Sequence, residues 1–197
     1  DGIALTVVNL GRPGALGIEE GVALEKRLER WDAPGLIVAY TGWNDVILAV
    51  NMDFAAVQGV SELDPEGFDF LEHLQYVNDH PQEFLDSKIG PAAGLKAARR
   101  HEGIRDRMRD VAIQNGAEIY FFQQPDALVS ATQLEGYEDI SGIADDDLLK
   151  SPLAQAVSVF ESEAAPETVS LRGLFVAAED PTFVGLVHQN EVGARLS

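Results

Sequence analysis

Residues 36–45 have the sequence Leu-Ile-Val-Ala-Tyr-Thr-Gly-Trp-Asn-Asp, an apolar run that ends abruptly in polar residues. The run is hydrophobic without alternation, which is typical of a parallel strand covered on both faces. Gly42 breaks the strand, so that Asn44 and Asp45 follow its carboxyl end, the edge at which open α/β sheets bind ligands. The alternative is a plain strand-to-helix turn in which Asn44 or Asp45 caps the helix.

Strand and helix patterns alternate on both sides of this stretch. The hydrophobic spacing predicts strands over residues 4–9, 118–123 and 171–177, and helices over residues 18–31, 46–50, 95–115 and 148–163. Polar loops lie at the ends of the predicted strands. This order of elements predicts an α/β fold, a three-layer sandwich with a mainly parallel sheet.

The composition limits the classes of protein to which the chain can belong. A chain of 197 residues suits one domain, and its 46% hydrophobic content is ordinary for a globular protein. The net charge of −19 argues against nucleic acid as a partner, because the basic footprint of such proteins is missing. No apolar run approaches the roughly 18 residues of a membrane helix, so no transmembrane segment is predicted. The absence of Cys excludes thiolate metal sites and a Cys nucleophile, and the compartment stays unassigned.

Two segments differ from the regular pattern. Residues 61–94 are acidic and contain three Pro, and we interpret them as an excursion near the edge of the sheet that faces a substrate. The helix over 95–115 carries five Arg largely off its apolar stripe, which favours a solvated face that forms salt bridges over a basic binding patch. Asn115 and Gly116 are expected to end that helix.

Three segments place groups suited to catalysis at one edge of the predicted sheet. Gly11 directly follows the first strand, where a backbone N–H can point into a cleft without obstruction by a Cβ atom. The Asn44 amide can stabilise developing negative charge without adding a titrating group, as an oxyanion hole requires. His188 lies in a late loop before a helix and is a candidate general base, whereas His73, His80 and His101 are expected at the surface.

Together these segments resemble the SGNH (GDSL-type) hydrolase family over nearly the whole chain. The second conserved block of that family is similar to Asn9-x-Gly11-x-x-Gly14, the third to Gly42-x-Asn44-Asp45, and the fifth to Val187-His188 followed by Gly193. The resemblance implies a flavodoxin-like sandwich and hydrolysis or transfer of an acyl ester. It further implies that His188 is the general base and that the Gly11 N–H and the Asn44 side chain belong to the oxyanion hole, with no metal or other cofactor.

The chain departs from the family pattern at two places. None of its nine Ser follows a strand as the family's nucleophile does, and the strand of that block would lie between residues 4–9 and 36–41. Without it, we expect those two strands to face each other across about 9–10 Å instead of the 4.8 Å of paired strands. We therefore expect 1–197 to be an excerpt of a longer domain, incomplete at both ends, or another chain or segment to complete the sheet.

The second departure is Gly185, which occupies the position of the family's Asp. Loss of that Asp can lower the catalytic rate by orders of magnitude.

Three hypotheses for function follow. The first is an esterase acting on a small-molecule or carbohydrate acyl ester, with a nucleophilic Ser outside residues 1–197. The second is a non-catalytic module that binds a ligand or partner in the inherited cleft, which Gly185 and the missing Ser favour. The third, a nucleotide-binding domain, is weaker because Gly11-x-x-Gly14-x-x-Gly17 matches no phosphate-binding motif.

Overall fold

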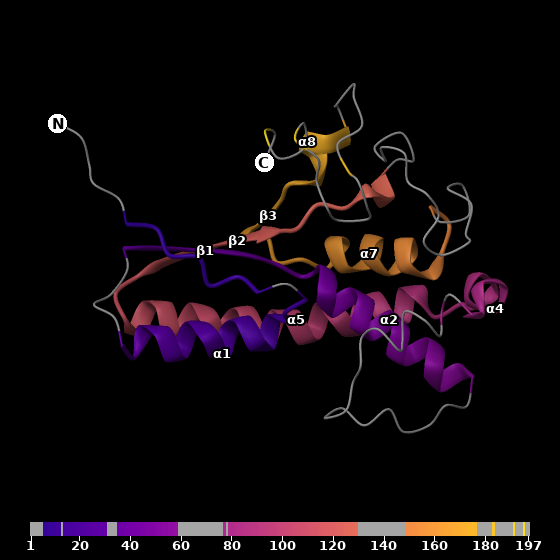
Figure 1. The fold of residues 1–197 in the computed structure, drawn as a ribbon, viewed down its shortest axis with the longest axis horizontal. Coiled ribbons are helices and arrows are strands. Elements are labelled where there is room, and N and C mark those ends of the chain that lie inside the picture. Colours follow the sequence, from indigo (N-terminus) through magenta and orange to yellow (C-terminus); the bar gives the residue numbers. More distant parts are fainter. Residues whose placement is uncertain are drawn as a thin grey trace.

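The chain forms a mixed α/β fold around a small parallel sheet (Figure 1). The computed structural model describes residues 6–12, 14–30, 35–58, 77, 79–129, 149–176, 183, 191 and 195. In these residues the strands are β1 (Leu36–Thr41), β2 (Glu118–Gln123) and β3 (Thr168–Ser170), which pair in the order β1-β2-β3. Both pairings are parallel, which confirms the predicted α/β class.

Helices flank and connect these strands. They are α1 (Gly17–Leu28), α2 (Trp43–Val57), α4 (Pro81–Asp86), α5 (Gly90–Gln114), α7 (Pro152–Ser162) and α8 (Arg172–Val176), with a short 3-10 turn, η1 (Ala127–Val129). Among the helices of the described residues, none combines the length and the apolar character needed to cross a membrane. Asn115 is the C-cap of α5, and Gly116 follows with a φ of 71°, as the sequence predicts.

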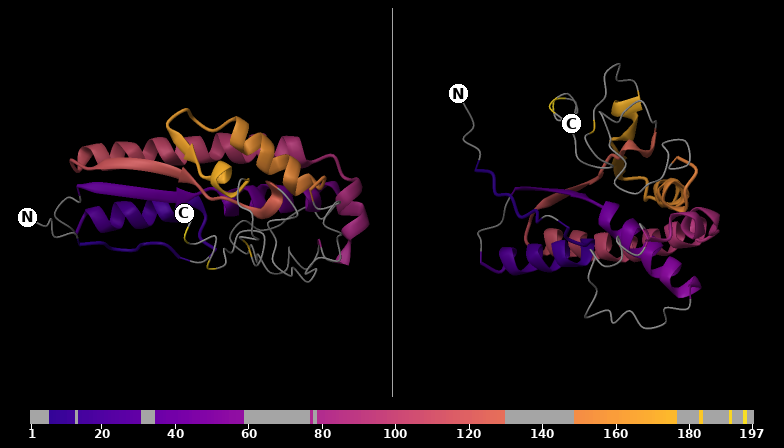
Figure 2. Two further views of the ribbon diagram at one scale, coloured as in Figure 1. Left: turned by 90° about the horizontal axis from the view of Figure 1, so that it is seen from above. Right: turned by 45° about the vertical axis from the view of Figure 1, so that its right-hand side comes forward.

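Helices α1 and α5 cover one face of the sheet and bury its inward side chains (Figures 1 and 2). Leu24 of α1 and Met108 of α5 pack with Ala39 of β1 and Phe121 of β2. Burial of a side chain as large as Phe121 contributes about 1.5–3 kcal/mol to stability. These contacts fix the direction of both long helices along the strands.

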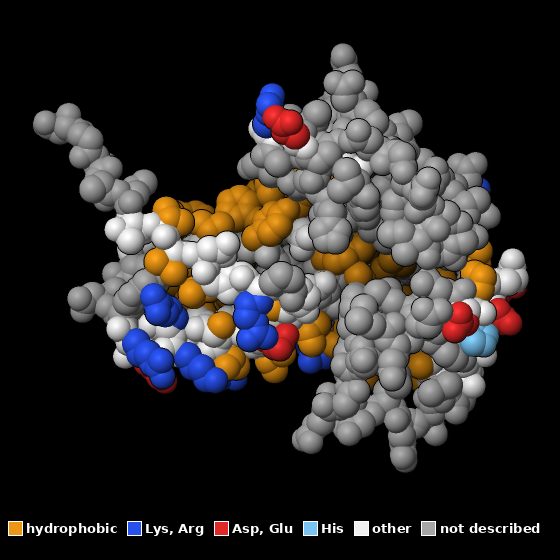
Figure 3. Space-filling model, viewed as in Figure 1, with side chains coloured by type: hydrophobic (Ala, Val, Ile, Leu, Met, Phe, Trp, Pro, Cys, Tyr) orange, Lys and Arg blue, Asp and Glu red, His pale blue; other side chains and the backbone are white. Residues whose placement is uncertain are grey.

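The opposite face of the sheet is open in the described residues. Leu36, Val38 and Tyr40 of β1 are 56%, 60% and 42% exposed, and Tyr120 and Val169 continue the same apolar surface. Hydrophobic atoms are accordingly visible above the strands (Figure 3). The expectation that β1 is covered on both faces therefore does not hold here, because the described residues supply two of the three expected layers. The far edge of β1 also has no strand partner among them.

The predicted first and last strands need correction. The described residues of the 4–9 segment, residues 6–9, form no strand, and Val7 is 86% exposed. No ladder joins them to β1, and a β-rich sequence does not form a strand without a pairing partner. Within the 171–177 segment, residues 172–176 form helix α8, which buries Phe175 against Phe183. The third strand lies earlier, at Thr168–Ser170.

Helix α5 begins earlier than the sequence analysis predicts and takes in the end of the supposed excursion. Residues 81–94 are mostly helical rather than irregular, and Phe84, Ile89 and Ala93 are buried in a second core formed with α2 and α7. Most of the rest of the 61–94 excursion lies outside the described residues. Pro91 sits in the first turn of α5, where a missing N–H costs nothing. The sequence pattern missed this turn because its side chains are small.

Candidate functional site

The carboxyl ends of β1 and β2 lie side by side and gather polar residues. Thr41 pairs with Gln123 in the parallel register, and the Gln124 N–H donates to the Thr41 carbonyl oxygen at 3.4 Å. A small pocket at this edge is lined by Gly42 and Trp43 after β1, by Gln123, Gln124 and Asp126 at and after the end of β2, and by Val46, Val157 and Phe160. This is the edge at which the sequence analysis places its site.

Gly42 makes the turn that starts α2. Its φ is 117°, a conformation that side chains rarely adopt, and a Cβ atom there would lie 3.0 Å from the Phe160 ring. The close contact with Phe160 and the turn therefore both require glycine. As a result, Asn44 and Asp45 fall in the first turn of α2 rather than at its N-cap, and neither caps this helix.

Asn44 is held in place by the segment that precedes α1. Its Nδ2 donates to the Ala15 carbonyl oxygen at 2.9 Å, and the side chain is half-buried. A side-chain amide has two N–H donors, so this bond fixes the group and leaves a second N–H for another acceptor. The position and the spare donor are compatible with the predicted oxyanion role.

Gly11 is placed differently from the prediction. Its backbone N–H donates to the Asn9 side-chain oxygen at 2.8 Å within an exposed loop. That local bond satisfies the donor that the hypothesis assigns to an oxyanion. His188, Gly185 and Gly193 lie outside the described residues, so the predicted general base is not placed relative to Asn44.

A buried polar pair that the sequence analysis missed lies beneath this edge. Asp45 and His101 are 3% and 6% exposed, and Asp45 Oδ2 is 3.4 Å from His101 Nδ1. The same carboxylate oxygen accepts the N–H of Gly17, the first residue of α1, at 3.1 Å. Asp45 therefore caps a helix, as in the alternative interpretation of this stretch, but the helix is α1 and not its own. A Cβ atom at Gly17 would lie 3.0 Å from that oxygen, so glycine permits the close approach.

The prediction of a surface position for His101 is wrong. The helical spacing indicates that His101 shares the buried face of α5, because it lies three residues before Ile104 and seven before Met108, which belong to that face. A polar residue on a core-facing stripe indicates a buried partner. The sequence alone did not show that this partner is Asp45.

Glu20 of α1 is a third ionisable residue in this region, in addition to Asp45 and His101. Burial raises the pKa of the Glu20 carboxyl above its ordinary value. A hydrogen bond from Thr41 works against that shift, while the nearby charge of Asp45 adds to it. The edge of the sheet therefore combines partly desolvated carboxylates with an imidazole.

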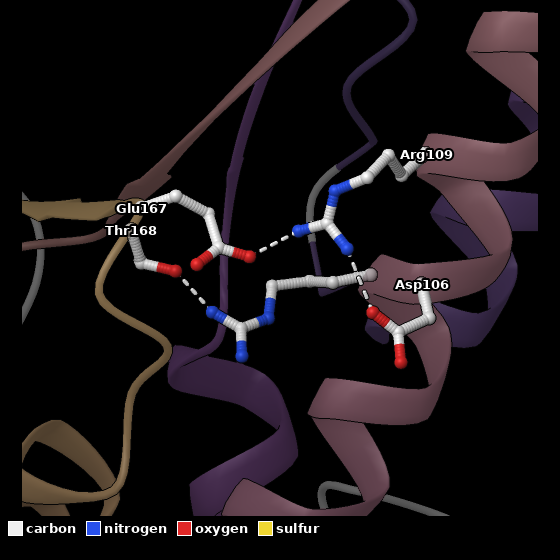
Figure 4. Close-up of polar contacts among 5 residues, drawn as sticks. Asp106, Arg109, Glu167 and Thr168 are labelled. Carbon is white, nitrogen blue, oxygen red and sulfur yellow. Dashed lines mark hydrogen bonds and ion pairs between the residues drawn. The ribbon is translucent and has the colours of Figure 1, made fainter.

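The arginines of α5 divide into two groups. Arg107 pairs with Glu25 of α1. Arg109 contacts Asp106 at 2.8 Å and also Glu167 after α7, as Figure 4 shows. These two confirm the predicted salt-bridging face. Arg105 is an exception, because it is only 3% exposed and donates from Nη1 to the Thr168 hydroxyl.

No cluster of three or more His, Asp or Glu side chains suited to a metal ion occurs within the described part of the chain. The groups that the described residues bring to the sheet edge include the Asn44 amide, the Asp45 and Glu20 carboxylates and the His101 imidazole. Comparison with known proteins found no matching family model, no matching curated protein and no matching solved structure.

Proposed function

We propose that this chain belongs to an SGNH-like esterase that hydrolyses a small-molecule or carbohydrate acyl ester. His188 acts as the general base, and a Ser outside residues 1–197 acts as the nucleophile. The observation that carries the proposal is the position of Asn44, just after the carboxyl end of β1, with one N–H fixed on Ala15 and a second N–H that no acceptor among the described residues engages. The amide would stabilise the oxyanion of the tetrahedral intermediate.

The reaction assigns a role to each group. The Ser oxygen attacks the ester carbonyl as His188 takes its proton, and the protonated His188 then gives that proton to the leaving alcohol. Water hydrolyses the acyl-enzyme with His188 again as base. Gly11 contributes its N–H to the oxyanion only if the bond to Asn9 opens, which makes Asn44 the stronger of the two donors.

The proposal also explains the open edge of the sheet. A strand beside β1 would pair the edge that has no strand partner among the described residues, and a further layer would cover Leu36, Val38 and Tyr40. Together they would complete a three-layer, flavodoxin-like sandwich. Amide hydrogen exchange tests this point. In a protein that carries the additional strand, consecutive β1 amides should all be protected, whereas exchange of every second amide would count against it.

The esterase assignment is tested by turnover of p-nitrophenyl acetate by a protein that contains both this chain and the Ser-bearing segment. His188→Ala should abolish most of the turnover, by about three orders of magnitude or more. His80→Ala is the matched control, because His80 is the N-cap residue of α4 and does not line the pocket at the strand ends. Full activity of His188→Ala would refute the assignment.

A non-catalytic binding module is the second candidate. The bond between the Gly11 N–H and Asn9 favours it, because one expected oxyanion donor is already satisfied. Gly185 in place of the family's Asp favours it too. A protein with no Gly-Asp-Ser ahead of this chain, and no turnover, would support the module and exclude the esterase.

A further inference from the structure

Helix α5 ends in a Schellman motif, a turn in which two backbone hydrogen bonds close the end of a helix. The Gly116 N–H donates to the Ile113 carbonyl oxygen at 3.0 Å. The Ala117 N–H donates to the Ala112 carbonyl oxygen at 2.9 Å. Gly116 has a φ of 71°, the left-handed conformation that the motif places just after the C-cap. The turn leads from α5 into the start of β2, at the end of the strands opposite the candidate site (Figure 1).

Asn115, the C-cap residue of this turn, is the only Asn of the chain that is followed by Gly. The backbone nitrogen of such a Gly can reach the side-chain carbonyl carbon of the Asn, because no Cβ atom obstructs the approach. A bond then forms between that nitrogen and that carbon. Ammonia leaves with the proton of the N–H group, and a succinimide ring results. Water opens the ring at either carbonyl, which gives Asp or isoaspartate.

The native turn engages both groups that this reaction needs. Asn115 Nδ2 donates to the Val111 carbonyl oxygen at 2.8 Å, and the Asn115 side chain is half-buried. The Gly116 N–H, which must lose its proton, is bound to Ile113. Both hydrogen bonds therefore have to open before the succinimide ring can close.

We propose that Asn115 is a deamidation site and that the last turn of α5 controls its rate. The ring closes only while the turn is open, so the rate follows the fraction of molecules in which the turn is open. Gly116 is exposed at the end of a helix, and helix ends open without unfolding of the core. Two hydrogen bonds slow the reaction by about tenfold or more relative to the unfolded chain.

The product weakens the turn in which it forms. A carboxylate has no N–H to donate to the Val111 carbonyl oxygen, so the bond from residue 115 is lost. The new negative charge lies beside the negative end of the α5 dipole. Isoaspartate also lengthens the backbone between α5 and β2 by one methylene group. Deamidation at Asn115 therefore destabilises the connection from α5 to the sheet, and this consequence is independent of the proposed esterase function.

The test is to incubate the protein in mildly alkaline buffer, with and without enough urea to unfold it, and to follow its peptides by mass spectrometry. Conversion at Asn115 should precede conversion at every other Asn, and unfolding in urea should accelerate it by about tenfold or more. Asn115→Gln is the control, because the longer side chain closes a ring far more slowly, and it should show no early conversion. Equal rates with and without urea, or earlier conversion at another Asn, would overturn the proposal.

Hydrogen exchange separates opening of the turn from unfolding of the whole chain. Because one opening frees both groups, the protection of the Gly116 N–H should match the factor by which folding slows deamidation. That factor should be smaller than the protection of the Phe121 N–H in the buried part of β2. If folding slowed deamidation as much as it protects Phe121, global unfolding would control the rate, and the role proposed for the turn would be wrong.

Discussion

Asp45 Oδ2 lies 3.4 Å from His101 Nδ1 and 3.1 Å from the N–H of Gly17, so that one buried carboxylate joins three helices. The three groups belong to α2, α5 and α1, respectively. Asp45 therefore links the turn after β1 to both helices that cover the sheet. The neighbouring Asn44 adds a second link through Ala15. The stretch that places the candidate oxyanion donor is thus also a junction of the fold.

Removing the Asp45 carboxylate should destabilise the protein more than removing any exposed acid of the same helix. Asp45→Ala leaves the Gly17 N–H without its acceptor and removes the carboxylate that lies beside the buried His101 imidazole, and we expect a loss of about 1–3 kcal/mol in the free energy of unfolding. Asp53→Ala, which breaks an exposed pair with Lys96, should cost less than about 1 kcal/mol. Urea unfolding of both variants measures the difference. Equal losses would contradict the role assigned to Asp45.

Glu20 predicts a pH dependence of stability. Because burial raises its pKa in the folded state above the ordinary 4.5, the folded chain binds this proton more tightly than the unfolded chain. The contribution of Glu20 to the free energy of unfolding is therefore complete below pH 4.5. It declines as the pH rises from there through the raised pKa of the folded state. At pH values above the folded pKa, the Glu20 carboxyl is ionised in the folded chain, and burial of that charge lowers the free energy of unfolding to the full extent.

Replacing the Glu20 carboxyl by an amide removes the cost of burying a charged carboxylate. Glu20→Gln should raise the urea midpoint relative to the wild type at about pH 7, and the gain should shrink toward about pH 4. Glu29→Gln, at an exposed position just after α1, should give no such trend. A gain that is equal at both pH values would show that the carboxyl charge is not responsible.

Two glycines of α5 should respond to alanine in opposite directions. A Cβ atom at Gly94 would overlap the backbone of Ala156 in α7, so Gly94→Ala should cost about 1–3 kcal/mol or more in unfolding free energy. Gly103 faces open space, and Gly103→Ala should stabilise the same helix by about 0.5–1 kcal/mol. Thermal or urea unfolding compares them. A neutral Gly94→Ala would mean that α5 and α7 are not packed as closely as described.

The sequence predicted best those elements whose own residues determine them. Strands β1 and β2 were found because each is an apolar run that ends at a polar turn, and α1 and α7 because their hydrophobic spacing is helical. The segment 4–9 failed because a strand depends on a neighbour, which local sequence does not reveal. Helix α8 was missed because five residues are too few to show a helical period.

The candidate site could be predicted only in part for the same reason. Asn44 was found because Gly42 marks the end of a strand, and the sheet topology then determines where the next residues lie. The contact between Asp45 and His101 joins residues that are far apart in the sequence, and the spacing of either residue alone does not identify its partner. The burial of Arg105 likewise depends on α7 and β3, which the pattern of α5 does not contain.

The most direct test of the account compares two asparagines of α2 in p-nitrophenyl acetate hydrolysis by the Ser-containing protein. Asn44→Ala removes the proposed oxyanion donor and should lower kcat by about 100- to 1,000-fold with little change in KM. Asn51→Ala, two turns later on the same helix and buried with no partner for its Nδ2 among the described residues, should keep kcat near the wild-type value. An Asn44→Ala enzyme as active as Asn51→Ala would contradict the proposed site.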